Sequence, residues 1–156
     1  MKWKIFAPFA IAILFCACMK VQLFEKNVVI PKQQWDYAFK PSVQFNIEDT
    51  TAGYDLYVVV RHTDAYNYNN IWMNLYIQAP GEASTKQQLD IPLATNDKGW
   101  LGKGMDDIFE HRYKVTRQPI AFRKAGIYQF TMEQIMRENP LEHVLDVGLR
   151  VEKANP

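Results

Sequence analysis

Cysteine is almost absent from this chain, and the positions of the few cysteines limit the roles that they can have. The two cysteines are Cys16 and Cys18, and no cysteine follows them. A domain without cysteine has neither a disulfide framework nor a thiolate metal site. The part of the chain after Cys18 must therefore be held together by packing alone. Its length is that of one domain that can bury a sizeable core.

Residues that often carry enzyme chemistry are also few. The histidines His62, His111 and His143 fall in different predicted segments, and none has the H-E-x-x-H spacing of a zinc site. Neither Ser42 nor Ser84 lies in a nucleophile elbow. The sequence therefore predicts a protein that is not an enzyme and holds no metal. A scattered active site would instead require histidines to meet carboxylates in a cleft.

The chain also lacks an excess of charge of one sign. Its formal net charge is +1, and basic and acidic residues are interspersed. This composition excludes the basic footprint of a nucleic-acid-binding protein and provides no polybasic arm for lipid headgroups. The neighbouring carboxylates Asp106 and Asp107 point to opposite sides of an extended chain. That arrangement suits neither a glycosidase pair nor a calcium loop.

The apolar run Ile5–Ala17 is too short for a permanent membrane span. A spanning helix needs about 20 apolar residues, and Pro8 lies inside this run. Lysines precede the run, and the small residue Ala17 ends it directly before Cys18. This order is typical of a cleaved secretory signal, which we predict over residues 1–17.

The position of Cys18 resembles the first mature residue of a bacterial lipoprotein. In that class the thiol receives a diacylglyceryl group and the new amino terminus is acylated, so we expect both lipids on Cys18 and no other cofactor. Two or more acyl chains hold a protein on its membrane, whereas one binds only marginally. Two alternatives stay open: a plain secretory peptide that leaves Cys18 as a free thiol, and a short uncleaved anchor.

Strand-like patterns dominate the rest of the chain. Apolar and polar residues alternate in residues 43–48 and 145–152, which is the period-2 pattern of a half-buried strand. Residues 56–60 are continuously apolar, as in a central strand covered on both faces. Further strands are predicted at residues 71–79, 88–93, 112–117 and 126–132, and helical turns only at residues 106–110 and 133–138.

These strands predict an all-β fold, a single antiparallel β-sandwich of jelly-roll or immunoglobulin-like topology. We expect residues 18–34 to form a lipidated tether and a first edge segment, because Pro31 disfavours a central strand. Residues 35–156 are expected to form the sandwich. Two hairpins are predicted within it, one that joins segments 54–63 and 71–79 and one that joins segments 112–117 and 126–132.

Aromatic side chains are the main candidates for a binding site. Trp72 and Tyr76 fall on the polar side of their predicted strand, and Tyr66 and Tyr68 lie in the loop before it. They predict an exposed patch that contacts a protein partner, since tryptophan and tyrosine are enriched at interfaces. Binding of a glycan to the same rings is the alternative. Trp100 opens a second candidate contact, a passage whose glycines indicate a positive φ or a close backbone approach.

Several stretches together resemble the gliding-motility lipoproteins of the GldH type from Bacteroidota. The resemblance covers nearly the whole chain after the predicted signal. It is carried by residues 54–61, 64–72 (DAYNYNNIW), 99–104 (GWLGKG), 126–128 with 136–137, and 147–150.

The resemblance implies an accessory lipoprotein without known catalysis, needed for the movement of surface adhesins and linked to type IX secretion. Its expected partners are the membrane, reached through the lipid on Cys18, and other gliding or secretion proteins of the envelope. Surface-exported lipoproteins of this phylum tend to carry an acidic run after the cysteine, and residues 19–23 have none. We therefore expect an outer-membrane protein that faces the periplasm. The glycine passage at Trp100 is a family signature without an assigned role.

Overall fold

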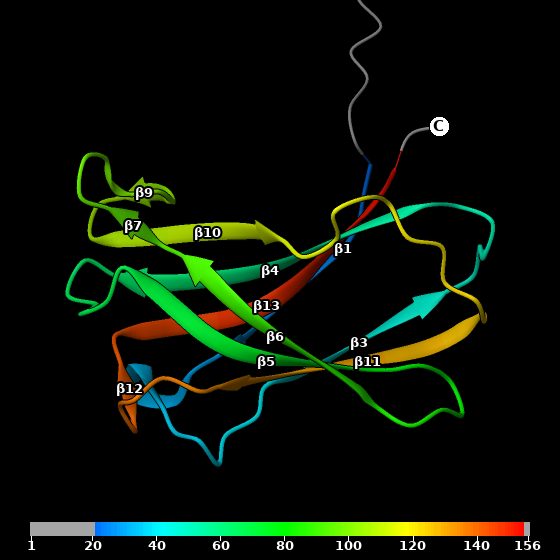
Figure 1. Ribbon diagram of the computed structural model, residues 1–156, viewed down its shortest axis with the longest axis horizontal. Helices are drawn as coiled ribbons and strands as arrows, with labels where there is room; N and C mark the ends of the chain where they lie inside the picture. Colours follow the sequence, from blue (N-terminus) through cyan, green and yellow to red (C-terminus); the bar gives the residue numbers. More distant parts are fainter. Residues whose placement is uncertain (1–20, 155–156) are drawn as a thin grey trace, which may run out of the picture.

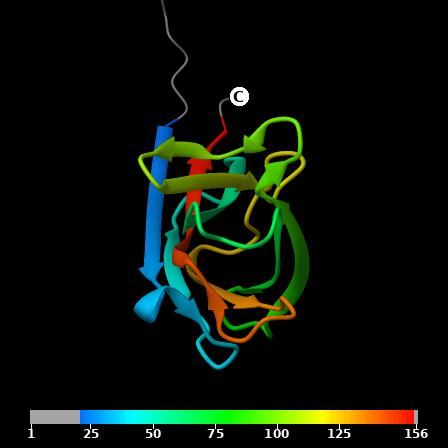
Figure 2. The ribbon, with the colours of Figure 1, turned by 90° about the vertical axis from the view of Figure 1, so that its left-hand side faces the viewer.

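Two antiparallel sheets stack to form a β-sandwich in the computed structural model, which describes residues 21–154 (Figure 1). One sheet has the strand order β1-β13-β4-β10-β9, and the other has the order β3-β11-β5-β6. Figure 2, seen from the end where β12 lies, shows the two sheets facing each other. The predicted all-β sandwich is confirmed.

The five-stranded sheet comprises β1 (Val21–Val29), β13 (Val144–Lys153), β4 (Tyr54–Thr63), β10 (Ile108–Lys114) and β9 (Lys103–Met105). The four-stranded sheet comprises β3 (Ser42–Ile47), β11 (Gly126–Gln134), β5 (Asn70–Gln78) and β6 (Thr85–Pro92). Two short pairs join β2 (Gln34–Trp35) to β12 (Leu141–Glu142) and β7 (Ala94–Thr95) to β8 (Gly99–Trp100). A 3-10 turn, η1 (Pro31–Gln33), follows β1.

The predicted signal peptide, residues 1–17, and the predicted lipidation site, Cys18, lie outside the described residues. The described chain begins with β1, the edge strand of the five-stranded sheet, which pairs with β13 along its length. Residues 21–29 of the expected tether are therefore part of the sandwich. Among the residues that the structure describes, none forms a helix with the length and hydropathy of a membrane span.

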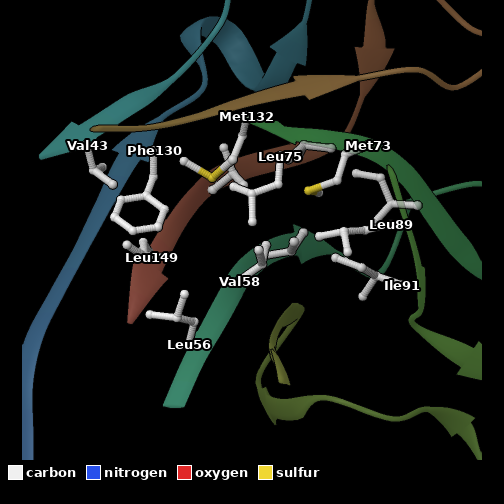
Figure 3. Packing of buried hydrophobic residues seen from close by; sticks show 14 of the residues in the cluster. Val43, Leu56, Val58, Met73, Leu75, Leu89, Ile91, Phe130, Met132 and Leu149 are labelled. Atoms are coloured by element: carbon white, nitrogen blue, oxygen red, sulfur yellow. The ribbon is translucent and has the colours of Figure 1, made fainter. Parts of the chain in front are cut away.

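The core is a single apolar layer between the two sheets. Successive side chains of a strand point to opposite faces, so each strand sends every second residue into this layer. Figure 3 shows Leu56 and Val58 of β4 and Leu149 of β13 on one side, and Leu75 of β5 and Phe130 of β11 on the other. Each is at most 1% exposed. Burying such a side chain contributes about 1.5–3 kcal/mol relative to leaving it in water.

Both predicted hairpins are wrong. β4 belongs to the five-stranded sheet and β5 to the four-stranded sheet, and β10 and β11 are divided in the same way. The chain crosses from one sheet to the other after β4 and after β10, so the apolar faces of these strands meet across the core and their edges do not pair. The predicted helical turns are wrong too, because residues 108–110 begin β10 and residues 133–134 end β11.

Ion pairs cover the outer face of the five-stranded sheet. Arg150 of β13 contacts Glu25 of β1 at 2.6 Å. Arg61 of β4 contacts the buried carboxylate of Asp146 in β13, also at 2.6 Å. The apolar stems of long basic side chains can shield a strand beneath them, and Val59 on this face of β4 is fully buried. β4 is therefore covered on both faces, as its continuous apolar run predicts.

Replacing Phe130 by alanine tests whether the apolar layer carries the stability. We expect the free energy of unfolding to fall by about 3–5 kcal/mol, because the substitution removes a buried ring and leaves a cavity. Gln129 is the matched control, since it precedes Phe130 in β11 and faces away from the core. Gln129→Ala should change the free energy by no more than about 0.5 kcal/mol. Urea unfolding of the mature chain measures both, and equal losses would contradict the assignment of faces.

Candidate functional site

The predicted contact aromatics separate into surface and core residues. Trp72 and Tyr76 follow the alternation of β5 and point away from the core, and Trp72 is 38% exposed. Tyr68 lies in the loop before β5 and is half-buried. Tyr66 is only 4% exposed, and Trp100 is half-buried. The candidate surface is therefore the outer face of the four-stranded sheet and the loop that leads into it.

Tyr68 and Trp72 line a groove of about 330 Å³ at one end of this face. The chain that leaves β11 forms the opposite wall. The Ile135 amide donates to the Trp72 carbonyl at 3.0 Å, and the Trp72 amide donates to the sulfur of Met136 at 3.1 Å. We call this site the Trp72 groove, and its lining residues are Tyr68, Asn70, Trp72, Ile135, Met136 and Arg137.

Polar groups surround the rings of the Trp72 groove. The side-chain amide of Asn70 donates to the carboxylate of Asp90 at 2.7 Å. A hydrogen bond to Glu138 raises the pKa of the Tyr68 hydroxyl, so this phenol stays protonated. Arg137 is exposed at the end of the groove. An aromatic wall with charged and amide neighbours can bind a partner that brings both apolar and polar groups.

Next to the groove, the face of the sheet is a network of hydrogen-bonding side chains centred on Glu133. This carboxylate accepts from Asn74 at 2.9 Å and from the Tyr76 hydroxyl at 2.7 Å, and it pairs with Lys40 at 2.6 Å. The bond from Asn74, followed by those from Lys40 and Tyr76, lowers the pKa of Glu133 to about 2. We call this region the polar sheet face, and its further members are Ser42, Gln44, Gln129 and Thr131.

Tyr66 and Trp100 pack inward around a buried histidine, His62. Their ring centroids lie 5.1 Å and 4.4 Å from that of His62. Tyr66 also meets the ring of Tyr68 edge-on at 5.8 Å, so the cluster adjoins the Trp72 groove. The prediction of Tyr66 as an exposed contact is wrong. Its hydroxyl donates to the carbonyl of Asn70, and this bond fixes the loop with the ring turned into the core.

A second histidine, His111 of β10, completes the cluster. Its Nε2 lies 2.9 Å from Nε2 of His62, and both rings are buried. Nδ1 of His62 donates to the Thr63 carbonyl at 2.7 Å, which assigns Nε2 of His62 as acceptor and Nε2 of His111 as donor. Both rings are neutral in this arrangement. Burial lowers the pKa of both, and with the effect of His62 the pKa of His111 falls to about 4.

The paired histidines bond to each other and to a main-chain carbonyl, and neither bonds to a carboxylate within residues 21–154. His143 lies apart and is half-buried, with its Nε2 3.9 Å from a carboxylate oxygen of Glu142. In the described part of the chain, no three His, Cys, Asp or Glu side chains are grouped to hold a metal ion. The geometry of the pair is that of a packed polar contact inside the core.

The glycine passage after Trp100 has a structural explanation. A Cβ on Gly102 would lie 2.6 Å from the Glu110 carbonyl and 2.7 Å from Nε2 of His111, so only glycine fits there. Gly99, the first residue of β8, has φ +67, a conformation that favours glycine. Of the two effects that the sequence indicated, the close approach occurs inside the passage at Gly102, and the positive φ occurs at Gly99, directly before Trp100. The passage therefore packs directly against His111, one of the two histidines of the cluster.

Comparison with known proteins identifies the family of this sandwich. A family model described as GldH lipoprotein matches residues 22–151. The chain belongs to the GldH lipoprotein family. A "Gliding motility lipoprotein GldH homolog" of Christiangramia forsetii is 28% identical over 152 residues, which is 92% of this chain and 91% of the relative. The "Gliding motility lipoprotein GldH" of Flavobacterium johnsoniae is 26% identical over 149 residues, 91% of each chain.

Two features of this GldH-family chain were missed by reasoning from the sequence. One is the wall of the Trp72 groove formed by Ile135 and Met136. These residues follow β11, and nothing in their sequence indicated that they lie beside Trp72. The other is the contact between His62 and His111. The sequence contained a signal for this contact, because both histidines occupy core-facing positions of their strands. The pairing of β4 with β10, which brings them together, was not predicted.

The histidine pair predicts how stability depends on pH. The folded chain resists protonation of His111 until about pH 4, whereas an unfolded histidine titrates near pH 6.5. Stability is therefore fully present above about pH 6.5 and is lost as the pH falls towards 4, by on the order of 3 kcal/mol. His111→Gln keeps a donor and removes this titration, so we expect a smaller slope in urea unfolding between these pH values. His143→Gln is the control, and an unchanged slope in His111→Gln would contradict the assignment.

Proposed function

We propose that this GldH-family chain is a membrane-anchored accessory protein of the gliding-motility machinery, which holds another envelope protein and catalyses no reaction. Its family membership and the names of its two relatives support the link to gliding. Acylated Cys18 supplies the anchor. We place the protein on the periplasmic side of the outer membrane, because residues 19–23 lack an acidic run.

The observation that carries the proposal is the composition of the Trp72 groove. Tryptophan, tyrosine, methionine and arginine are enriched in the cores of protein interfaces. All four types line the groove, as Trp72, Tyr68, Met136 and Arg137. The site contains no histidine or serine that would act as a base or a nucleophile, which supports a binding role. We propose that its partner is a protein of the gliding apparatus or of the type IX secretion system linked to it.

The position of the groove supports the same role. The described chain begins at the first residue of β1, which pairs with the last residue of β13. The start of β5 and the segment between β11 and β12, which supply the residues of the groove, lie at the opposite end of the sandwich (Figure 1). β4 spans the distance between the two ends in 10 residues, which corresponds to about 30 Å at 3.3 Å per residue. An anchored domain with this geometry presents the groove away from its membrane.

Glycan binding is the second candidate function, and the polar sheet face favours it. Pyranose rings stack on flat aromatic rings and present several hydroxyls to amides and carboxylates. Tyr76, Asn74 and Glu133 supply such groups on one flat surface, beside Trp72. On this alternative, the protein holds an envelope polysaccharide and the groove marks one end of its site.

The double substitution Trp72→Ala with Tyr68→Ala tests the protein-docking proposal. We expect the affinity for the co-purifying partner to fall by roughly 30-fold or more, since a central aromatic contributes about 2 kcal/mol or more at an interface. The measurement is quantitative mass spectrometry after gentle detergent extraction of the tagged chain. Tyr57→Ala, on the outer face of the other sheet, is the matched control. The glycan alternative would be favoured by two results together. The double variant would keep its partner yield and its bound polysaccharide, and Tyr76→Ala would lose the polysaccharide.

Substitution of Cys18 by alanine tests the anchor. We expect the variant to leave the membrane fraction for the soluble one, because a chain without acyl groups loses about 0.8 kcal/mol per buried methylene. Fractionation of cells and mass spectrometry of the N-terminal peptide measure the change. A wild-type peptide that starts elsewhere or carries no lipid would contradict the proposal.

A further inference from the structure

The end of the sandwich at which the described chain begins has an exposed basic loop, residues 115–125. This end is located by strand register. Val21 of β1 pairs with Lys153 of β13, Lys153 pairs with Tyr54 of β4, and Tyr54 forms a bridge to Ile120 of the loop. These residues therefore form one row across neighbouring strands, at the end of the five-stranded sheet where β1 begins. Neighbouring strands lie about 4.8 Å apart, so Ile120 is roughly 15 Å from Val21.

The loop is held in a fixed conformation. The Ile120 amide donates to the Tyr54 carbonyl at 2.9 Å, and the Tyr54 amide donates to the Ile120 carbonyl at 2.8 Å. The buried ring of Phe122 packs on Tyr54 at 5.3 Å and on Tyr128 at 4.6 Å between centroids. The Tyr128 hydroxyl donates to the carbonyl of Lys124. These contacts fix how the loop presents its other side chains.

The exposed side chains of this loop suit an anionic surface. No acidic residue occurs between Glu110 and Glu133, and the loop itself contains Arg117, Arg123 and Lys124. Arg117 and Arg123 are exposed and have no ion-pair partner within residues 21–154. Ile120, 38% exposed, lies between them in sequence. An apolar side chain flanked by free cations is typical of a segment that rests on a phospholipid surface.

Two carboxylates near this end are paired with lysines. Asp49 pairs with Lys153 at 2.8 Å, and Glu82 pairs with Lys124 at 2.7 Å. Glu48 accepts a hydrogen bond from the neutral amide of Asn46 and keeps its negative charge. Arg117 and Arg123 lie in no ion pair among residues 21–154, although Arg123 contributes to the lowered pKa of Glu82. The two arginines outweigh the single charge of Glu48, so the loop has a local excess of positive charge that the net charge of the whole chain does not show.

We propose that the 115–125 loop docks on the anionic phospholipid headgroups of the membrane that holds Cys18. The inference rests on the proposed acylation, because Cys18 precedes Val21 by three residues and three residues reach at most about 10 Å. An anchored Cys18 thus brings the row that contains Val21 and Ile120 to the membrane surface. Docking at Arg117 and Arg123 fixes the orientation of the sandwich and directs the Trp72 groove into the periplasm.

Reconstitution of the acylated mature chain, which starts at Cys18, into phosphatidylethanolamine vesicles with and without phosphatidylglycerol tests this orientation. Ile120→Cys labelled with a fluorophore reports docking, and Asp97→Cys at the opposite end is the reference position. We expect an aqueous quencher to reach the label at 120 less readily when phosphatidylglycerol is present, while the label at 97 stays accessible in both vesicles. Arg117→Glu with Arg123→Glu should restore access at 120, with a docking constant lower by roughly 30-fold, about fivefold for each arginine.

The matched control is Lys98→Glu with Lys103→Glu, which makes the same charge change on exposed residues at the opposite end. This variant should leave the accessibility of the label at 120 unchanged. Mass spectrometry of Cys18 and co-sedimentation separate the two proposals. An acylated chain that sediments with vesicles but exposes position 120 equally with and without phosphatidylglycerol overturns docking alone. A chain without the lipid overturns the anchor and docking together.

Discussion

The apolar layer between the two sheets is the interaction on which the rest of the structure depends. The chain after Cys18 has no cysteine, so no disulfide reinforces this layer. Each strand contributes to it through the period-2 alternation of its side chains, and the same alternation directs the polar half of each strand outward. The positions of Leu75 and Phe130 in the layer therefore also determine where Trp72 and Glu133 stand on the surface. Core packing and the candidate binding face are two results of one pattern.

That pattern also sets the limit of what the sequence can predict. Alternation identified the strands around Leu75 and Leu149 and the faces that they bury, and a continuous apolar run identified the strand around Val58, so the sandwich was predictable. It does not say which sheet a strand joins, because a strand of a hairpin and a strand across the core have the same alternation. Two hairpins were wrong for this reason. Tyr66 was misplaced because a loop has no period, whereas Trp72 was placed outward correctly because it lies in a strand.

The two outer faces of the sandwich differ in how their polar groups are satisfied. On the five-stranded sheet, Arg61 and Arg150 engage buried or half-buried carboxylates at short distances, so most of the charge is neutralised within the face. On the four-stranded sheet, amides, hydroxyls and rings predominate, and Trp72 stays partly open to solvent. A face whose charges are already paired gains little by binding a charged partner. An open aromatic groove gains from burial of its rings, which is the physical reason that the proposed docking site lies there.

Net charge conceals this distribution. A value of +1 argues against a nucleic-acid partner, but it averages over charges that are paired and charges that are not. Pairing depends on the fold, since Lys124 meets Glu82 and Lys153 meets Asp49 across long stretches of sequence. Once such pairs are set aside, Arg117 and Arg123 are cations of the 115–125 loop without an ion pair among residues 21–154, and Phe122 holds this loop on the sandwich. Local unpaired charge, which depends on the fold, is therefore the quantity on which the proposed membrane docking of the 115–125 loop rests, and the Trp72 groove lies at the other end of the sandwich.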